Sequence, residues 1–376
     1  MSIRIVHTAD NHIGIKYLKY PENVRKTLVS ERFDALERLV KMANDKLAHF
    51  FVVAGDLFDS TQVRVGDIEK TVALLKGFSG EAVLIVPGNH DYCSGPDSDF
   101  WRRFRQACES VDNIQVLSTS QVREFEIDGR LVQFFPCPCP SKTGSDPTTA
   151  WVATCDQRNS DAVKIGIAHG NVTGLGLDAA DQYFTMDRAA LEKSGLTTWL
   201  LGHIHVPFPP TESGNQSTFF MAGIHTPDSV RVRHQGSAWY LECEPHGVVA
   251  YQQLKPGRIR FIRLVLDLAN AEDIDRLLQE CRAFTPAETV LDLQLSGQLG
   301  KEDQKKLRAA TNTLSDQYLH LSVEQDLRDR IDAGVIAATY RSGSLAERLI
   351  TALVDDRDFP DAATLAHEII QEVSQR

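Results

Sequence analysis

Length, composition and charge are those of an ordinary folded protein. The chain has 376 residues, 42% of them hydrophobic and 24% charged, and its formal net charge is −11. At this length two or three domains are expected. The acidic excess argues against a protein that coats nucleic acid by bulk attraction, but it does not exclude a nuclease whose bound cations face the phosphate.

The sequence also bears on location. No apolar run approaches the ~20 residues that span a bilayer, and the N-terminus enters a predicted strand without a secretory signal pattern. The seven cysteines, among them Cys137 and Cys139, are odd in number and scattered. Such usage is typical of reduced thiols. We therefore expect a cytoplasmic protein with no membrane association.

Five short apolar segments each run into a turn that carries Asp, Asn or His. In chain order these are 3–6 before Asp10, Asn11 and His12; 50–53 before Asp56; 83–86 before Asn89, His90 and Asp91; 165–168 before His169; and 199–201 before His203 and His205. Open α/β folds place their ligands at the carboxyl ends of buried strands. We therefore expect the five turns to meet at one site.

The segments between these turns predict the rest of a first domain, over residues 1–255. Helical spacing of apolar residues at 32–43 and 66–77 predicts crossover helices between parallel strands. Another buried strand is expected at 131–135. Short strands at 218–221, 238–242 and 247–254 predict a second sheet layer that closes the domain.

The pattern changes near residue 255. Strands at 260–267, 289–295 and 318–323 alternate with helices at 273–283 and 302–314, which predicts a separate α/β capping domain over 256–330. The tail, 331–376, predicts two amphipathic helices broken near Pro360. Their apolar faces are formed by Leu345, Leu349 and Leu353 in the first helix, and by Leu365, Ile369 and Val373 in the second.

The residue types in the five turns favour a two-metal site. Carboxylate, amide and imidazole ligands without cysteine suit Mn²⁺, Fe²⁺, Zn²⁺ or Mg²⁺. Asp10 and His12, at alternate positions, can bind one ion together, and so can His203 and His205. Two ions about 3.5–4 Å apart need a shared carboxylate, and Asp56 is the natural bridge.

The order D-x-H, G-D, G-N-H-D, H-G, G-H-x-H resembles the calcineurin-like metallophosphoesterase superfamily. The resemblance implies one ion held by Asp10, His12, Asp56 and His205, and a second held by Asp56, Asn89, His169 and His203. It also implies that His90 is catalytic and is not a ligand. Water activated between two cations would attack phosphorus, while His90 would assist the leaving oxygen.

The opening 5–14, the turn 55–59, the capping domain and the helical tail together resemble the SbcD-type DNA repair nucleases. The implied fold is an α/β metallophosphoesterase β-sandwich flanked by helices, with an α/β cap and a helical tail. The implied function is a two-metal DNA exonuclease, also a candidate single-strand endonuclease, with Mn²⁺ as the expected ion. The implied partners are DNA, a second copy in a homodimer and an SMC-like ABC ATPase of the SbcC type.

Two other functions stay open. The same chemistry could act on a small or protein phosphoester, although the cap and tail have no role in that reaction. A metal-bound scaffold with little activity of its own is the other alternative, but a scaffold has no need of the full ligand set.

Several neighbouring residues also have two interpretations. His7 is expected to be a packed, hydrogen-bonded strand residue, and His225 a structural imidazole rather than a substrate contact. Asp59 either supports the site or contacts DNA, or else it caps a helix or turn. Asp91 either orients His90 or caps the segment that follows it. The basic clusters 102–105 and 231–234 either touch a phosphate backbone or are solvated surface.

Overall fold

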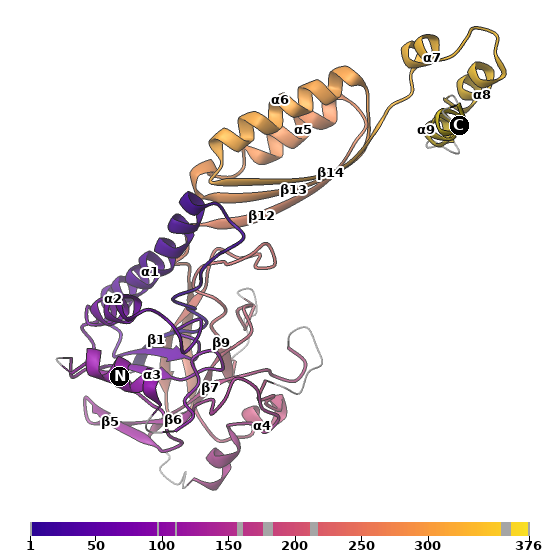
Figure 1. Cartoon of the computed structure of the whole chain (residues 1–376). Helices are drawn as coiled ribbons and strands as arrows, with labels where there is room; N and C mark the ends of the chain where they lie inside the picture. Colours follow the sequence, from indigo (N-terminus) through magenta and orange to yellow (C-terminus); the bar gives the residue numbers. More distant parts are fainter. Residues whose placement is uncertain are drawn as a thin grey trace. The chain divides into compact units, whose positions relative to one another are not determined.

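The computed structural model describes residues 2–95, 98–109, 111–155, 161–175, 183–210, 217–354 and 362–374. It divides into two compact units, Met1–Arg260 and Phe261–Arg376, and Figure 1 labels many of their helices and strands. The predicted boundary after residue 255 lies close to this division. The separate tail domain stays a prediction.

The first unit contains a six-stranded sheet in the order β11-β10-β1-β2-β3-β4. Its parallel strands are β1 (Ile3–Thr8), β2 (Phe50–Ala54), β3 (Ala82–Val86) and β4 (Ile114–Val116), and its antiparallel strands are β10 (Ala238–Glu244) and β11 (Gly247–Leu254). Every residue of β2 and β3 is buried. Continuous apolar strands of this kind are typical of a parallel sheet that is covered on both faces.

A five-stranded sheet in the order β5-β6-β7-β8-β9 forms the second layer. Its strands are β5 (Arg123–Ile127), β6 (Arg130–Cys137), β7 (Val163–His169), β8 (Thr198–Gly202) and β9 (Phe219–Met221). Phe50 and Val52 of the first sheet share one core with Phe134, Ile165 and Leu200 of the second. The two sheets therefore pack face to face, which confirms the predicted β-sandwich.

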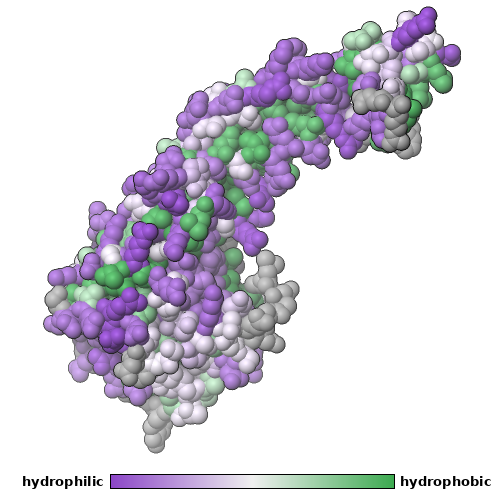
Figure 2. All heavy atoms as spheres, in the orientation of Figure 1, coloured by the Kyte–Doolittle hydropathy of each residue, from purple (hydrophilic) through white to green (hydrophobic). Residues whose placement is uncertain are grey.

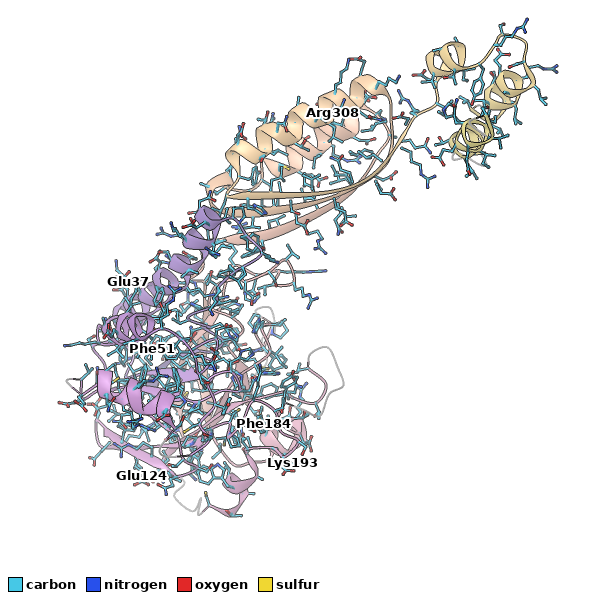
Figure 3. All side chains as sticks on the ribbon, in the orientation of Figure 1. Glu37, Phe51, Glu124, Phe184, Lys193 and Arg308 are labelled. Atoms are coloured by element: carbon cyan, nitrogen blue, oxygen red, sulfur yellow. The ribbon has the colours of Figure 1, made fainter. Side chains whose placement is uncertain are left out.

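Helices cover the outer faces of this sandwich. On the first sheet lie α1 (Glu22–Asp45), α2 (Val65–Leu75) and α3 (Asp99–Ala107); on the second lie the 3₁₀ turn η1 (Ala150–Thr154) and α4 (Arg188–Glu192). Phe51, labelled in Figure 3, packs with Leu36 and Leu39 of α1 and Phe104 of α3. Alternate residues of one strand thus supply two cores, because successive side chains point to opposite faces.

The predicted second layer at 218–254 is wrong for two of its three strands. β9 does join the second sheet, but β10 pairs along the free edge of β1 in the first, and β11 follows it there. Trp239 and Leu241 face the core between the sheets, while Ala238 packs on the helical side. An alternating pattern predicts that a strand exists, but it does not say which sheet edge the strand joins.

The second unit has the predicted β-α-β-α-β order. Its elements are β12 (Arg260–Leu268), α5 (Ala271–Cys281), the 3₁₀ turn η2 (Pro286–Glu288), β13 (Thr289–Leu299), α6 (Lys301–Gln317) and β14 (His320–Asp329). The sheet order is β12-β13-β14, and Figure 1 shows both helices on one face of it. Leu277 of α5 and Leu307 of α6 pack on Leu291 and Leu293.

The described part of the tail contains three helices, where the sequence predicted two: α7 (Ala333–Thr339), α8 (Leu345–Val354) and α9 (Ala362–Ser374). Ile331, Ile336 and Ile350 form a small core. The predicted break near Pro360 lies outside the described residues. Helix α7 was missed because its seven residues are too few to show a helical period. Within the described ranges, no helix has the length and apolar character that crossing a bilayer requires.

Candidate metal centre

All five predicted turns follow the carboxyl ends of strands, three in the first sheet (β1, β2, β3) and two in the second (β7, β8). Backbone bonds tie the first two turns together. Asp10 N–H donates to the Gly55 carbonyl at 3.1 Å, and His12 N–H donates to the Asp56 carbonyl at 3.0 Å. The site is therefore built where the ends of the two sheets meet.

Four of the predicted ligands have left-handed backbone conformations. The φ angles are 52° at Asp10, 42° at His12, 52° at Asp56 and 95° at His203. A non-glycine residue pays a steric penalty in this region, so it stays there only where surrounding contacts hold it. A donor atom of each of these four side chains lies 3.1–3.9 Å from a donor atom of another proposed ligand.

One group of donor atoms is formed by Asp10, His12 and His205. His205 Nε2 lies 3.7 Å from Asp10 Oδ1, and His12 Nε2 lies 3.9 Å from the same oxygen. The two imidazole Nε2 atoms are 3.3 Å apart. These three side chains come from both sheets and converge on one point.

A second group is formed around Asn89 and His169. Asn89 Oδ1 lies 3.0 Å from His169 Nε2 and 3.1 Å from His203 Nδ1. Asp56 Oδ2 lies 3.2 Å from His169 Nε2 and 3.8 Å from Nε2 of His12 in the first group. Asp56 therefore lies between the two groups, where a bridging carboxylate belongs.

The donor set fits two divalent cations. Ligand atoms at about 2.0–2.2 Å from one ion lie roughly 3 Å from one another, close to the shorter separations in both groups. Asp10 is fully buried and Asp56 is 1% exposed, and within the described part of the chain both carboxylates face histidines rather than Lys or Arg. Buried carboxylates need a cation or donors to offset their desolvation.

The pKa shifts in the second group are also those expected of a cation site. Burial alone would raise the pKa of Asp56, but His169 and His12 hold that pKa below its ordinary range. Burial alone would lower the pKa of His169, but the Asp56 carboxylate raises it to about 9. A proton on His169 thus supplies, beside Asp56, the positive charge that a bound cation would supply on displacing it. Burial lowers the pKa of His203 to about 3, so this imidazole is neutral and free to act as a ligand.

His90 is held beside the two groups by its backbone and by one ring nitrogen. Its N–H donates to Asp56 Oδ1 at 2.8 Å, and its Nδ1 donates to the Asp59 carbonyl at 2.9 Å. This bond fixes the tautomer and leaves Nε2 for other partners. His90 also lies close enough to His12 and Asp56 to belong to a donor group, so proximity alone does not separate a catalytic role from a ligand role.

Asp91 does not orient His90, and the predicted alternative of capping the following segment is also incorrect. Its Oδ1 accepts the Gly88 N–H at 2.7 Å, and its Oδ2 accepts the Phe58 N–H at 3.0 Å. The side chain is fully buried, and it joins the turn after β3 to the turn after β2. Two backbone donors without other acceptors attract this carboxylate more strongly than an imidazole whose Nδ1 is already bonded.

Asp59, rather than Asp91, supports the site. Its carbonyl holds His90, and its Oδ1 lies 3.5 Å from His12 Nδ1. Burial would raise the pKa of Asp59, but His12 lowers it, so the carboxylate stays ionised. Of the roles left open for Asp59, support of the site is the one that these contacts favour.

The other outlying residues are structural. His7 is fully buried in β1, and burial lowers its pKa to about 3. In α3, Arg102 pairs with Asp99 while Trp101 and Phe104 are buried. The arginines of this cluster thus lie on a solvated face of α3, and their contact with a phosphate backbone stays a prediction.

Sequence reasoning missed Arg32 and Asp228, which lie directly behind the ligands. Nothing in the sequence around Asp228 indicates a role at the site. The position of Arg32 could have been noticed, because a charged residue four positions from both Leu28 and Leu36 falls on the apolar, buried face of α1.

The centre is open to solvent through a cavity of about 200 Å³ lined by His12, His90, His203 and His205 among others. A larger cavity of about 930 Å³ shares Ile15 and Asp59 with it. Its lining includes five basic side chains: Lys16, Arg25, Lys26, Arg64 and Lys70. A cationic groove therefore leads away from a centre rich in metal ligands.

Comparison with known proteins agrees with this geometry. Residues 3–207 match the calcineurin-like phosphoesterase family model. The chain belongs to that family. The predicted resemblance to metallophosphoesterases is thus confirmed.

Individual relatives are distant. The chain is 24% identical over 295 residues to the uncharacterized metallophosphoesterase YhaO of Bacillus subtilis, covering 74% of this chain and 66% of the relative. It is 24% identical over 281 residues to the DNA double-strand break repair protein Mre11 of Aeropyrum pernix (72% and 65%), and 25% identical over 299 residues to Mre11 of Haloferax volcanii (78% and 62%). The matches thus span slightly less than two thirds of each relative.

Proposed function

We propose that this metal-dependent phosphoesterase cleaves DNA as an exonuclease, with single-strand endonuclease activity at the same site. The observation that carries the proposal is the convergence of seven donor side chains in two groups joined by Asp56, with His90 beside them. The proposed ligands are Asp10, His12, Asp56 and His205 for one ion, and Asp56, Asn89, His169 and His203 for the other.

The residues divide the chemistry between them. Two divalent ions, Mn²⁺ in our proposal, would supply a nucleophile at neutral pH and stabilise charge on the phosphoryl oxygens. Because the Asp59 carbonyl accepts the Nδ1 proton of His90, Nε2 is the ring nitrogen left for the leaving ribose oxygen, and it donates a proton there from the imidazolium form of the ring. The burial of Asp10 and His169 keeps bulk water from competing for these ligands.

Two observations support DNA as the substrate: the cationic groove and the names of the similar proteins. Lys16, Arg25 and Arg64 line a cavity that adjoins the metal centre, so the local charge favours a polyanion although the whole chain is acidic. Two of the similar proteins are named for DNA double-strand break repair.

The exposed apolar side chains of the tail support the proposal of an ATPase partner. Leu345, Leu365, Ile369 and Val373 are 53–83% exposed, and Figure 2 shows green apolar surface on the C-terminal helices. An apolar stripe on helices with such a small core is typical of a helix-binding face. We propose that it binds the coiled-coil root of an SMC-like ABC ATPase of the SbcC type, and that the chain works as a homodimer.

Parallel assays test the proposed function. The purified protein, loaded with Mn²⁺, is compared on linear DNA, hairpin DNA and bis-p-nitrophenyl phosphate, with Asp56→Ala as the inactive control. We expect cleavage of both DNAs and of the small ester. Hydrolysis of the ester without any DNA cleavage would favour a small-molecule phosphodiesterase, and inactivity of the loaded protein on all three substrates would favour a scaffold.

A further inference from the structure

One arginine is enclosed in the N-terminal unit beside the metal centre. Arg32 lies on the buried face of α1 and is 1% exposed. A buried guanidinium is costly unless its donors are satisfied and its charge is offset. The groups that bond its donors and offset its charge therefore show which part of the structure this arginine stabilises.

Arg32 makes three hydrogen bonds, to residues in or near the turn after β1 and in the loop after β9. Its Nε donates to Tyr17 Oη at 2.9 Å, and its Nη1 donates to the carbonyl of Asn11 at 3.0 Å. Asn11 separates the proposed ligands Asp10 and His12. The carbonyl of Arg32 itself accepts a hydrogen bond from His225 Nε2 at 2.9 Å. This bond gives His225 the structural role that the sequence predicted.

The remaining donor of Arg32 faces an acid. Nη2 is buried and has no hydrogen-bond partner within the described residues, and Asp228 Oδ2 lies 3.9 Å from it. The same Asp228 oxygen lies 3.6 Å from Nδ1 of His205. Asp228 is thus placed between the guanidinium and a proposed metal ligand.

His205 is the ligand that most needs such support. Its side chain is 32% exposed, against 6% for His12. An exposed imidazole can rotate unless a group facing its second nitrogen restricts it, and a carboxylate in that place favours one ring orientation and one tautomer. His234 Nε2 donates to the His205 carbonyl at 2.7 Å, so the loop 225–234 bonds the backbone of His205 and places a carboxylate 3.6 Å from its ring.

We propose that Arg32 and Asp228 are positioning residues that aim His205 Nε2 at the ion shared with Asp10 and His12. Arg32 holds both sides of this ion site, because it bonds the backbone between Asp10 and His12 and faces the carboxylate behind His205. The proposal rests on the proposed function in one respect: it takes the cluster of Asp10, His12 and His205 as a metal site.

Metal binding, measured without DNA, tests the proposal. The variants are Asp228→Asn, Arg32→Met and Arg32→Lys, and the measurements are bound Mn²⁺ by mass spectrometry and its affinity by titration calorimetry. We expect one of the two ions to bind roughly 10–100-fold more weakly in Asp228→Asn and Arg32→Met, the range found for groups that orient ligands. Arg32→Lys, which keeps the charge, should recover part of the affinity.

Arg38→Met is the matched control. Arg38 lies on the same helix, and its guanidinium bonds Glu31 at 2.5 Å and the Pro256 carbonyl at 2.6 Å, with no proposed ligand among these partners. This variant should bind both ions normally. If Arg32→Met fails to fold, the metal affinity of Asp228→Asn tests the proposal alone. This variant should fold, since the Asp228 side chain is 18% exposed and the change is isosteric.

A double-mutant cycle separates positioning from general support. If Asp228 acts through His205, then Asp228→Asn should cost no further affinity once His205 is replaced by Ala. Two ions bound with unchanged affinity in Asp228→Asn would overturn the proposal. A wild-type protein that binds two ions but cleaves no DNA would instead overturn the proposed function and leave this proposal standing.

Discussion

Asp56 shows how much a single residue of this site does. Its Oδ2 faces His169, its Oδ1 accepts the backbone N–H of His90, and its carbonyl accepts the N–H of His12. These contacts are made at a left-handed φ of 52°, a region that Asp enters more often than most non-glycine residues but still at a steric cost. The surrounding contacts offset this cost and hold the turn in its conformation.

Replacing Asp56 and replacing His90 should have different consequences. Asp56→Ala removes the shared ligand, so both bound metal and cleavage should be lost. His90→Asn should keep both ions and lower kcat by about 10²–10⁴-fold, because it removes a proton donor to the leaving group. Metal analysis beside a nuclease assay separates the two. Loss of metal from His90→Asn would show that His90 is a ligand.

Asp91 should matter for stability. In Asp91→Ala, the N–H groups of Gly88 and Phe58 lose their buried acceptor, at about 1–3 kcal/mol for each unsatisfied donor. Urea unfolding of the metal-free protein should show this loss. Asp99→Ala, at an exposed ion pair, is the control and should change the unfolding free energy by no more than about 0.5 kcal/mol. Equal stability of the two variants would contradict the bonding described here.

At the scale of elements, the sequence predicted what depends on local pattern. Strands β1, β2, β3, β7 and β8 were predictable because each is an apolar run that ends at a polar turn. The place of β10 beside β1 was not predictable, since it depends on which sheet edge is free. The same limit applies to Arg32 and Asp228, which are close in space but 196 positions apart in the sequence.

The tail helices should act through their exposed stripe. Replacing Leu349 and Ile369 by Glu should abolish co-purification with the ATPase while the melting temperature stays unchanged, because both side chains face solvent. Arg341→Glu, an exposed change outside the stripe, is the control. A stripe that merely seals this protein's own fold would show a large fall in melting temperature instead.

Considered as a whole, the N-terminal unit gathers its ligands from two separate sheets. His12 follows β1 in the first sheet, whereas His205 follows β8 in the second, yet their Nε2 atoms are 3.3 Å apart. Ions bound here would therefore cross-link the sandwich at the ends of its strands. Binding to the folded state alone stabilises it in proportion to the logarithm of ligand concentration.

This coupling gives a prediction about the choice of metal. Mn²⁺ should raise the melting temperature and support cleavage better than Mg²⁺, because Mg²⁺ prefers an all-oxygen octahedron and several of the proposed ligands are imidazoles. At about 100 times its dissociation constant, one ion contributes roughly 2.7 kcal/mol to stability. Thermal melts and DNA cleavage are measured over a titration of each ion, with Asp56→Ala as the control that should respond to neither. Equal or greater stabilisation and activity with Mg²⁺ would contradict the ligand set, since a centre that prefers Mg²⁺ would have to use fewer of these histidines.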